Sequence, residues 1–129
     1  MEKRFEEWIN LKGKLHGKNN DPPRVKKGDI WWTSIGENIG FEINGKSQLF
    51  TRPVIILKKM MYGLYFVIPT TTKIKNRPWL VPFRHRSLDM VACIHHARPI
   101  DYRRLSSCIG EINESDFARI KAAFRNYFL

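Results

Sequence analysis

The spacing of apolar residues along this 129-residue chain changes near residue 28. Before that point the apolar side chains repeat along one helical face, with glutamates early and lysines late, as the helix dipole favours. The pattern predicts a helix over residues 1–18, followed at 19–27 by a linker that contains Asn-Asn-Asp-Pro-Pro. We therefore expect an N-terminal helical extension (1–18), a linker (19–27) and a main domain over residues 28–129. The apolar residues of the helical face are Phe5, Trp8, Ile9 and Leu15.

From residue 28 onward, short runs rich in Val, Ile and aromatic residues follow one another, each bounded by Gly, Pro, Asn or charged residues. No helical pattern separates these runs, which favours an antiparallel, strongly curved sheet or small barrel over a doubly wound α/β fold. The predicted strands are 29–34, 53–58, 64–69, 79–83 and 90–96, with a last short strand at 109–112.

A C-terminal helix is predicted after the last strand, capped by Asn113 or Ser115. Its apolar stripe indicates that it packs on the sheet, and the members of that stripe are Phe117, Ile120, Phe124 and Phe128. Residues 36–51 form the longest loop, and a loop of that length is more often functional than a short one.

Composition fits one compact domain, with 43% hydrophobic and 27% charged residues. The longest apolar run, residues 60–69, is about half of the ~20 residues that a membrane-spanning helix needs, and the N-terminus lacks the apolar segment of a signal peptide. We expect a cytoplasmic protein with no membrane association. Cys93 and Cys108 cannot form a disulfide framework, and we expect both to be buried free thiols.

The net charge of +11 is concentrated in the middle of the chain. Residues 43–110 carry twelve Lys and Arg against two acidic residues, while the segments on either side are nearly balanced. Such a segment attracts polyanions, of which nucleic acid is the commonest in the cytosol. A basic surface without a ligand is the competing interpretation.

The sequence contains no Gly-rich phosphate loop, nucleophile elbow or metal-binding histidine pair on a helix, so most large enzyme classes are unsupported. It also predicts no metal site and no cofactor. The remaining candidates are polar residues near strand ends: Glu42, Arg52, the run 70–73 (Thr-Thr-Thr-Lys), His95, His96 and Arg98.

Three segments resemble the motifs of the MazF/PemK family of toxin endoribonucleases, in the family order. The first comprises residues 27–32 (KGDIWW), 39–42 (IGFE) and 52–57 (RPVIIL); the second is 67–76 (VIPTTTKIKN); the third is 97–105 (ARPIDYRRL). The resemblance implies a fold that is mainly β with α: a small SH3-like (MazF/CcdB/Kid-type) curved antiparallel barrel with a C-terminal helix, here with an extra N-terminal helix. It also implies a homodimer that cleaves single-stranded RNA without a metal and is inhibited by a cognate antitoxin.

The chain departs from the family pattern at several places. The helix before Asn19 is an appendage, and the loop between Glu42 and Arg52 is several residues longer than usual. His95 stands where relatives commonly carry a carboxylate, and Cys93 where the PemK branch carries an Arg.

Cleavage of RNA through its own 2′-hydroxyl needs a base, an acid, and cations or donors on the phosphate oxygens. Arg52 suits the phosphate, because a guanidinium forks two oxygens and stays protonated. Thr71, in the second motif, can donate to phosphate or orient the 2′-hydroxyl, and His95 titrates near neutrality and can move protons. Each has a structural alternative as ordinary surface, strand-end or packing residue. Because His95 and His96 are adjacent on a predicted strand, we expect them to face opposite sides.

Further candidates concern RNA binding. Lys73, Lys75, Arg77 and Arg84 flank Trp79, as single-stranded nucleic-acid surfaces interleave charge with stacking platforms. Arg98 belongs to the third motif, and Glu42 either takes part in the site or holds Arg52 and shapes the loop. Solvated surface charge is the alternative for all of them.

Two other functions stay open. One is a non-nuclease gyrase poison of the CcdB type, and the other is a catalytically dead module that binds RNA or antitoxin. The combination of Arg52 with Thr71 favours the nuclease, whereas the replaced carboxylate at His95 supports the dead module.

Overall fold

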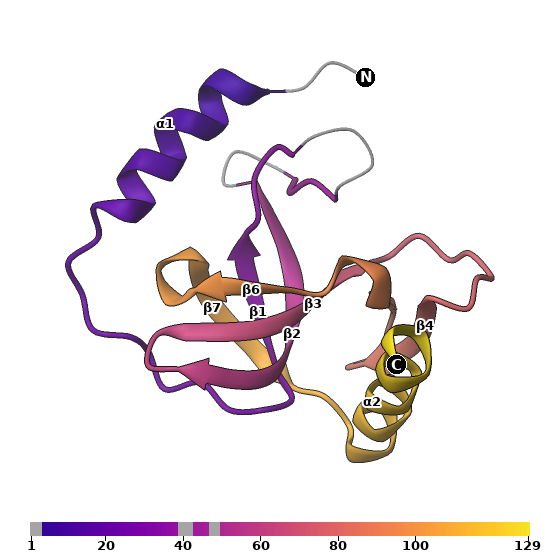
Figure 1. Ribbon diagram of the computed structural model, residues 1–129. Helices are drawn as coiled ribbons and strands as arrows, with labels where there is room; N and C mark the ends of the chain where they lie inside the picture. The colour runs from indigo at the N-terminus through magenta and orange to yellow at the C-terminus, as the bar shows by residue number, and fades with distance from the viewer. Residues whose placement is uncertain (1–3, 39–42, 47–49) are drawn as a thin grey trace.

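Seven strands of this chain pair into one antiparallel sheet in the computed structural model, which describes residues 4–38, 43–46 and 50–129 (Figure 1). A helix precedes the sheet and another follows it, and two single 3₁₀ turns interrupt the later strands. In chain order the elements are α1 (Phe5–His16), β1 (Asp29–Ser34), β2 (Thr51–Met61), β3 (Leu64–Thr71), β4 (Leu80–His85), β5 (Leu88–Cys93), η1 (Ile94–His96), β6 (Arg98–Asp101), η2 (Tyr102–Arg104), β7 (Leu105–Glu111) and α2 (Glu114–Phe128).

The sheet branches at β3, because two different strands pair with the same edge of it. The start of β3 pairs with β6, from Leu64 opposite Asp101 to Val67 opposite Arg98, and its end pairs with β5 through Thr70 and Thr71. The other edge of β3 pairs with β2, and the strand order is β4-β5-β3-β2-β1-β7. The expected curved antiparallel sheet is confirmed. Within the described residues no hydrogen-bonded pairing joins its two end strands, β4 and β7, so the sheet does not close into a complete barrel.

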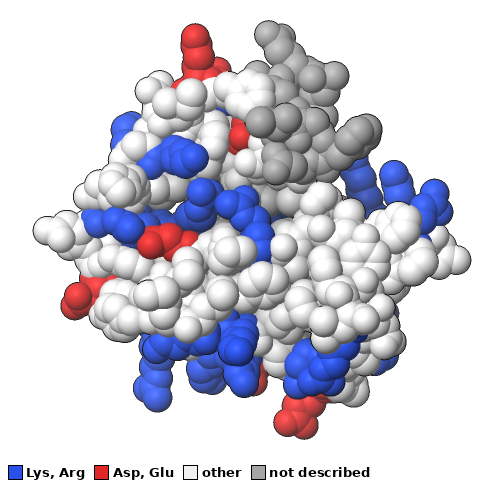
Figure 2. All heavy atoms as spheres, in the orientation of Figure 1, with Lys and Arg blue, Asp and Glu red and all other residues white. Residues whose placement is uncertain are grey.

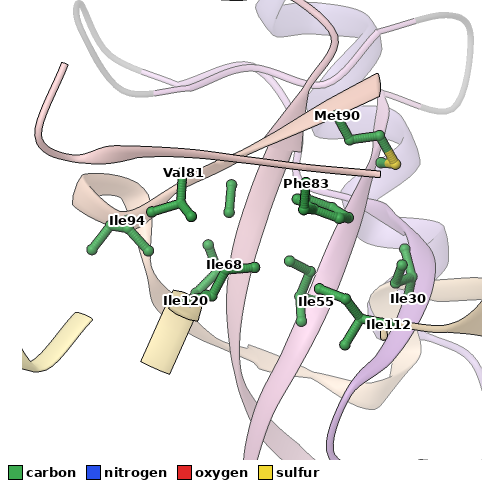
Figure 3. Packing of buried hydrophobic residues seen from close by; sticks show 10 residues of the cluster. Ile30, Ile55, Ile68, Val81, Phe83, Met90, Ile94, Ile112 and Ile120 are labelled. Carbon is green, nitrogen blue, oxygen red and sulfur yellow. The ribbon is translucent and has the colours of Figure 1, made fainter. Parts of the chain in front are cut away.

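Both faces of the central strands are buried. Ile55 of β2 belongs to one apolar cluster, while its neighbours Val54 and Ile56 belong to another, as the alternation of side chains along a strand requires. The first cluster packs beneath α2, whose Ile120 is fully buried, and Figure 3 shows it at close range. Its buried members are Ile30, Ile55, Ile68, Val81, Phe83, Met90, Ala92, Ile94, Ile112 and Ile120.

The helices are attached to the sheet in different ways. The side chain of Asn113 caps α2, accepting from the backbone amides of Ser115 at 2.8 Å and Asp116 at 3.4 Å, as the sequence predicts. The other helix, α1, lies outside the two sheet clusters and packs through Trp8 and Leu15, with Phe50 as their partner from the long loop. Neither helix is long and apolar enough to cross a membrane.

Most of the expected strands form near their predicted positions, and three expectations need correction. Residues 98–101 form β6, which the sequence pattern did not predict, and β7 begins at Leu105 rather than at residue 109. The strand expected at 90–96 ends at Cys93, because residues 94–96 turn as a 3₁₀ helix.

This turn overturns the expectation that His95 and His96 face opposite sides. Their ring centroids lie 3.9 Å apart, because a 3₁₀ turn does not alternate its side chains as a strand does. The cysteine expectation is half right. Cys93 is buried, but Cys108 is exposed, since it lies on the end strand β7.

Candidate functional site

A hollow of about 810 Å³ lies where β2 begins, β3 ends and β5 gives way to η1. Arg52 comes from β2, Thr71 from β3 and His95 from η1, so segments far apart in sequence meet in one place. The residues that line the hollow are Arg4, Glu37, Ile43, Asn44, Gly45, Lys46, Arg52, Thr71, Lys73, Lys75, Arg77, Trp79, Leu80, Cys93, His95 and His96.

Strand register explains why Arg52 and Thr71 meet. Val54 lies opposite Pro69 in the β2–β3 ladder, and continuing this antiparallel register by two residues places Arg52 opposite Thr71. The hydroxyl of Thr70 donates to the Pro53 carbonyl at 2.7 Å, which ties the two strands together beside the hollow. The paired ends of two central strands therefore hold both candidate residues.

The Arg52 side chain is held by the long loop. Its Nε donates to the backbone carbonyl of Asn44, and it is partly buried. Burial lowers the pKa of Arg52, while the nearby Cys93 thiol acts in the opposite direction. A guanidinium nevertheless stays protonated at neutral pH, so Arg52 brings a positive charge to the hollow.

Cys93 does not neutralise that charge. Burial raises the pKa of Cys93 to about 11, although Arg52 opposes this rise. The thiol is therefore uncharged at neutral pH and does not form an ion pair with Arg52. Among the described lining residues no carboxylate pairs with Arg52, so its charge is available there to an anionic ligand.

Two imidazoles line the hollow side by side. Burial lowers the pKa of His95, and a hydrogen bond to the Trp79 backbone partly offsets this effect. The indole ring of Trp79 lies 5.9 Å from the His95 ring. His95 is therefore mostly neutral at pH 7, which is the form that accepts a proton.

Thr71 lies at the end of β3 with its hydroxyl partly engaged. Its Oγ1 accepts from the backbone amide of Lys73 at 3.2 Å, which shapes the turn into the basic segment. A hydroxyl that accepts one bond can still donate its own hydrogen to a ligand. Both the structural and the ligand-binding interpretation of Thr71 thus fit this geometry.

Charge in the hollow is strongly positive. Lys73, Lys75 and Arg77 are exposed along the segment that leaves β3, and Lys46 approaches from the long loop. Among the described lining residues the one carboxylate is Glu37, and it is bound to the Arg4 guanidinium at 3.2 Å. Figure 2 shows that Lys and Arg gather in several separate groups over the face of the molecule seen in Figure 1.

Two of the predicted RNA-binding residues lie away from the hollow, and a third cannot be placed. Arg84 lines a different hollow of β4 and α2, where its Nε lies 3.7 Å from Asp89 Oδ1. Arg98 lies on β6 opposite Val67 and is not among the lining residues. Glu42 falls outside the described residues. Contact of Arg84 and Arg98 with RNA stays a prediction, and it requires that the bound RNA extend beyond the hollow.

Several lining residues had not been singled out from the sequence. Glu37, Asn44 and Lys46 belong to the long loop, whose length was the one signal available. Arg4 belongs to the segment before α1 and reaches the hollow through tertiary packing, which no local pattern announces. His96 is a polar candidate that the strand prediction places on the side opposite to His95.

The family model described as "PemK-like, MazF-like toxin of type II toxin-antitoxin system" matches residues 26–128 of this chain. The chain belongs to this family. α1 and Arg4 lie outside the part that the family model matches. No curated protein sequence matches the chain significantly.

Solved structures of MazF proteins share the fold of this family member. MazF from Deinococcus radiodurans is similar with a TM-score of 0.68 at 21% identity, covering 84% of this chain and 97% of that one. The MazE–MazF complex from the same organism gives 0.62 at 20% identity, covering 84% and 96%. An endoribonuclease in complex with its cognate antitoxin, from a mycobacterial species, gives 0.61 at 13% identity, covering 80% and 93%.

Proposed function

We propose that this MazF/PemK-type toxin is a metal-independent, sequence-selective endoribonuclease that cleaves single-stranded RNA through the 2′-hydroxyl. The observation that carries the proposal is the convergence of Arg52, Thr71 and His95 on one cationic hollow. A phosphate-binding cation, a hydroxyl donor and a group that titrates near neutrality are the chemical functions that such cleavage needs.

In the proposed reaction the 2′-oxygen attacks the adjacent phosphorus and the bond to the 5′-oxygen breaks. The products are a 2′,3′-cyclic phosphate and a free 5′-hydroxyl. His95 in its neutral form takes the proton of the 2′-hydroxyl, while Arg52 and Thr71 stabilise the charge that gathers on the non-bridging oxygens. His96, beside His95, is the second imidazole available to move a proton to the leaving oxygen.

Glu37 does not replace the carboxylate that relatives commonly carry at the His95 position. Its Oε1 is held by both Nε and the terminal guanidinium nitrogen of Arg4, at 3.3 and 3.2 Å. This charge-assisted pair commits the Glu37 carboxylate to the segment before α1. His95 is thus the better-placed proton acceptor of the described lining residues.

RNA enters, in this proposal, along the basic segment that follows β3. Lys73, Lys75 and Arg77 supply phosphate contacts, and Trp79 supplies a ring on which a base stacks. We further propose that the toxin acts as a homodimer and that an acidic antitoxin inhibits it. The structurally similar MazE–MazF and endoribonuclease–antitoxin complexes support the binding of an antitoxin.

The test is incubation of the purified protein with a long single-stranded RNA in the presence of a chelator. We expect discrete fragments, with their number set by a short recognition sequence. RNA that is bound but stays intact would identify a binding module instead. If the protein neither binds nor cleaves RNA but causes gyrase-dependent DNA breaks, the gyrase-poison alternative holds.

A further inference from the structure

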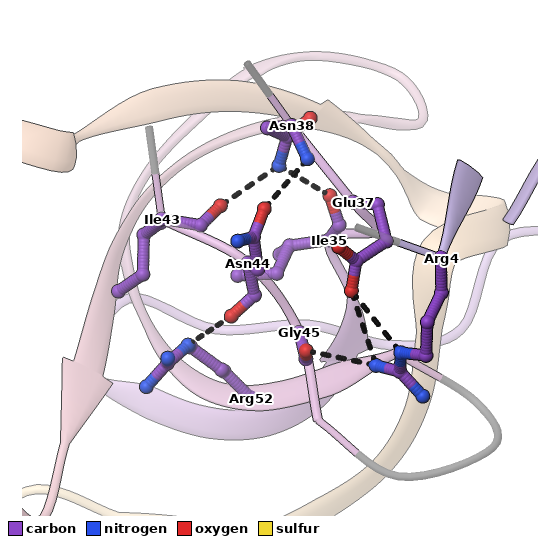
Figure 4. A network of polar contacts seen from close by, with 8 residues as sticks. All are labelled: Arg4, Ile35, Glu37, Asn38, Ile43, Asn44, Gly45 and Arg52. Atoms are coloured by element: carbon purple, nitrogen blue, oxygen red, sulfur yellow. Dashed lines mark hydrogen bonds and ion pairs between the residues drawn. The ribbon is translucent and has the colours of Figure 1, made fainter. Parts of the chain in front are cut away.

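A chain of polar contacts runs from the segment before α1 to Arg52, and Figure 4 shows it. Arg4 binds the carboxylate of Glu37, and its terminal guanidinium nitrogen also donates to the Gly45 carbonyl at 3.4 Å. Next to Gly45, the carbonyl of Asn44 accepts from Arg52 Nε. The N-terminal segment and the Arg52 guanidinium are therefore linked through the adjacent loop residues Asn44 and Gly45.

Asn38 fixes the same loop segment through further hydrogen bonds to Ile43 and Asn44. Its backbone amide donates to Asn44 Oδ1 at 2.6 Å, and its side-chain amide donates to the carbonyls of Ile35 at 3.0 Å and Ile43 at 2.8 Å. Asn44 is thus held through its side chain while its carbonyl is aimed at Arg52. Glu37, the partner of Arg4, is the residue directly before Asn38.

The loop has little room to rearrange at this place. The Gly45 amide donates to the Gly36 carbonyl at 2.7 Å, and a Cβ on Gly45 would lie 1.6 Å from the Phe50 carbonyl oxygen. Gly36 has a φ of +86°, and a Cβ there would lie 2.1 Å from the Trp8 ring of α1. The helix and the loop are therefore packed as one unit, with Glu37 only 6% exposed in its side chain.

From these contacts we propose that Arg4 and Glu37 are positioning residues. Together with α1 they hold loop residues 43–46, which aim the Arg52 guanidinium into the hollow. This inference rests on the proposed function for its activity readout. It assigns a purpose to the helix that lies outside the family match, and to the lengthened loop. The helix compensates for the freedom that a longer loop would otherwise give to Asn44 and hence to Arg52.

The competing explanation is that Arg4 binds RNA directly, because it also lines the hollow. Glu37→Gln separates the two explanations, since they predict effects of opposite sign. If Arg4 binds RNA, loss of the Glu37 charge makes the hollow more positive and strengthens RNA binding. If the pair positions the loop, the same substitution loosens Asn44 and slows cleavage.

The experiment measures cleavage kinetics and the exchange rate of the Arg52 Nε–H, observed by NMR with nitrogen-labelled arginine. We expect Arg4→Gln and Glu37→Gln each to lower kcat about tenfold with little change in KM, since misorientation weakens stabilisation of the transition state. Both should accelerate exchange of the Arg52 Nε–H. Glu7→Gln, an exposed change of the same type on α1, should alter neither quantity.

Unchanged exchange of the Arg52 Nε–H in both variants would overturn the proposal, as would a Glu37→Gln protein that cleaves as fast as the wild type or faster. A protein that shows the expected exchange but never cleaves RNA would refute the proposed function while upholding the positioning role. The two claims therefore fail separately.

Discussion

At the scale of the residue, Arg52 brings a positive charge to a hollow shared with Thr71 and His95, and no carboxylate among the described lining residues forms an ion pair with it. Its place at the start of β2 and its bond to the Asn44 carbonyl fix the guanidinium at the paired end of a central strand. The sequence motifs point to Arg52 and Thr71, whereas His95 lies outside the motifs and is a candidate because imidazole titrates near neutrality. The neighbouring thiol of Cys93, uncharged at neutral pH, explains why the charge remains available.

Thr71→Val should reduce cleavage, and by less than loss of Arg52 does. Valine keeps the shape and strand preference of threonine but removes the hydroxyl hydrogen that could bond phosphate. A hydrogen bond to a charged group such as phosphate is worth at least about 1.5 kcal/mol, which corresponds to a loss of roughly tenfold. Single-turnover rates on a short RNA measure it. A fully active valine variant would show that Thr71 serves only the turn to Lys73.

The pH dependence of kcat/KM tests His95. Its neutral form is the base, and burial lowers its pKa, so activity should rise with pH along a limb below about 6.5 and be complete at neutral pH. His95→Gln should flatten the limb and lower the plateau. Because His96 lies beside His95 and is the proposed proton donor to the leaving oxygen, His96→Gln should lower the plateau but keep the limb. A limb that is identical in all three proteins would contradict the assignment.

At the scale of the element, the predicted strands succeeded where apolar runs were bounded by clear breaks, as at Asp29–Ser34. The misses have physical causes. β6 contains two central apolar positions beside Arg98 and Asp101, which is too short a run to show alternation. The 3₁₀ turn at 94–96 follows a buried strand without a Gly or Pro, so the sequence offered no break, and the two histidines were placed wrongly.

Asn113→Ala should destabilise the protein by about 1 kcal/mol, because the backbone amides at the start of α2 lose their side-chain acceptor. The same change at Asn126 provides the control, since that exposed residue lies within the helix, where alanine is the better helix former. Urea unfolding followed by circular dichroism measures both. Equal stability of the two variants would show that the cap contributes little.

At the scale of the whole molecule, the sequence shows that the excess of positive charge belongs to residues 43–110, but it does not show where these side chains lie in three dimensions. The fold gathers Lys46, Arg52, Lys73, Lys75 and Arg77 around one hollow, and sends Arg84 and Arg98 elsewhere. The link from Arg4 to Glu37 joins residues 33 positions apart, and no local pattern encodes such a contact. Long-range packing, rather than propensity, therefore completes the site.

RNA affinity should fall with added salt, with a log–log slope of about −0.7 for each phosphate that the protein neutralises on a single strand. Lys75→Ala should make the slope less steep by about that amount, because its ammonium lines the hollow. Lys59→Ala, an exposed change outside the hollow, should leave the slope unchanged. Fluorescence anisotropy at several salt concentrations provides the data. Identical slopes for the two variants would argue that RNA does not follow the basic segment.

An acidic antitoxin peptide should compete with RNA for the same cations. A disordered acidic chain that folds on binding would cover the hollow and exclude phosphate, and its inhibition should weaken with salt. RNA affinity measured with and without saturating antitoxin decides the matter. Simultaneous binding with little mutual effect would contradict direct competition and direct attention to the long loop as the antitoxin's contact.

The most direct test of the central claim compares the wild type, Arg52→Ala and Arg24→Ala on one RNA that contains a cleavage site, in chelator, with analysis of the product ends. Arg24 is exposed before β1 and lies outside the hollow, so its variant is a matched control. We predict 2′,3′-cyclic phosphate and 5′-hydroxyl ends from the wild type and Arg24→Ala, and a loss of rate on the order of a hundredfold or more for folded Arg52→Ala. Near-normal cleavage by Arg52→Ala, or intact RNA with the wild type, would contradict the account.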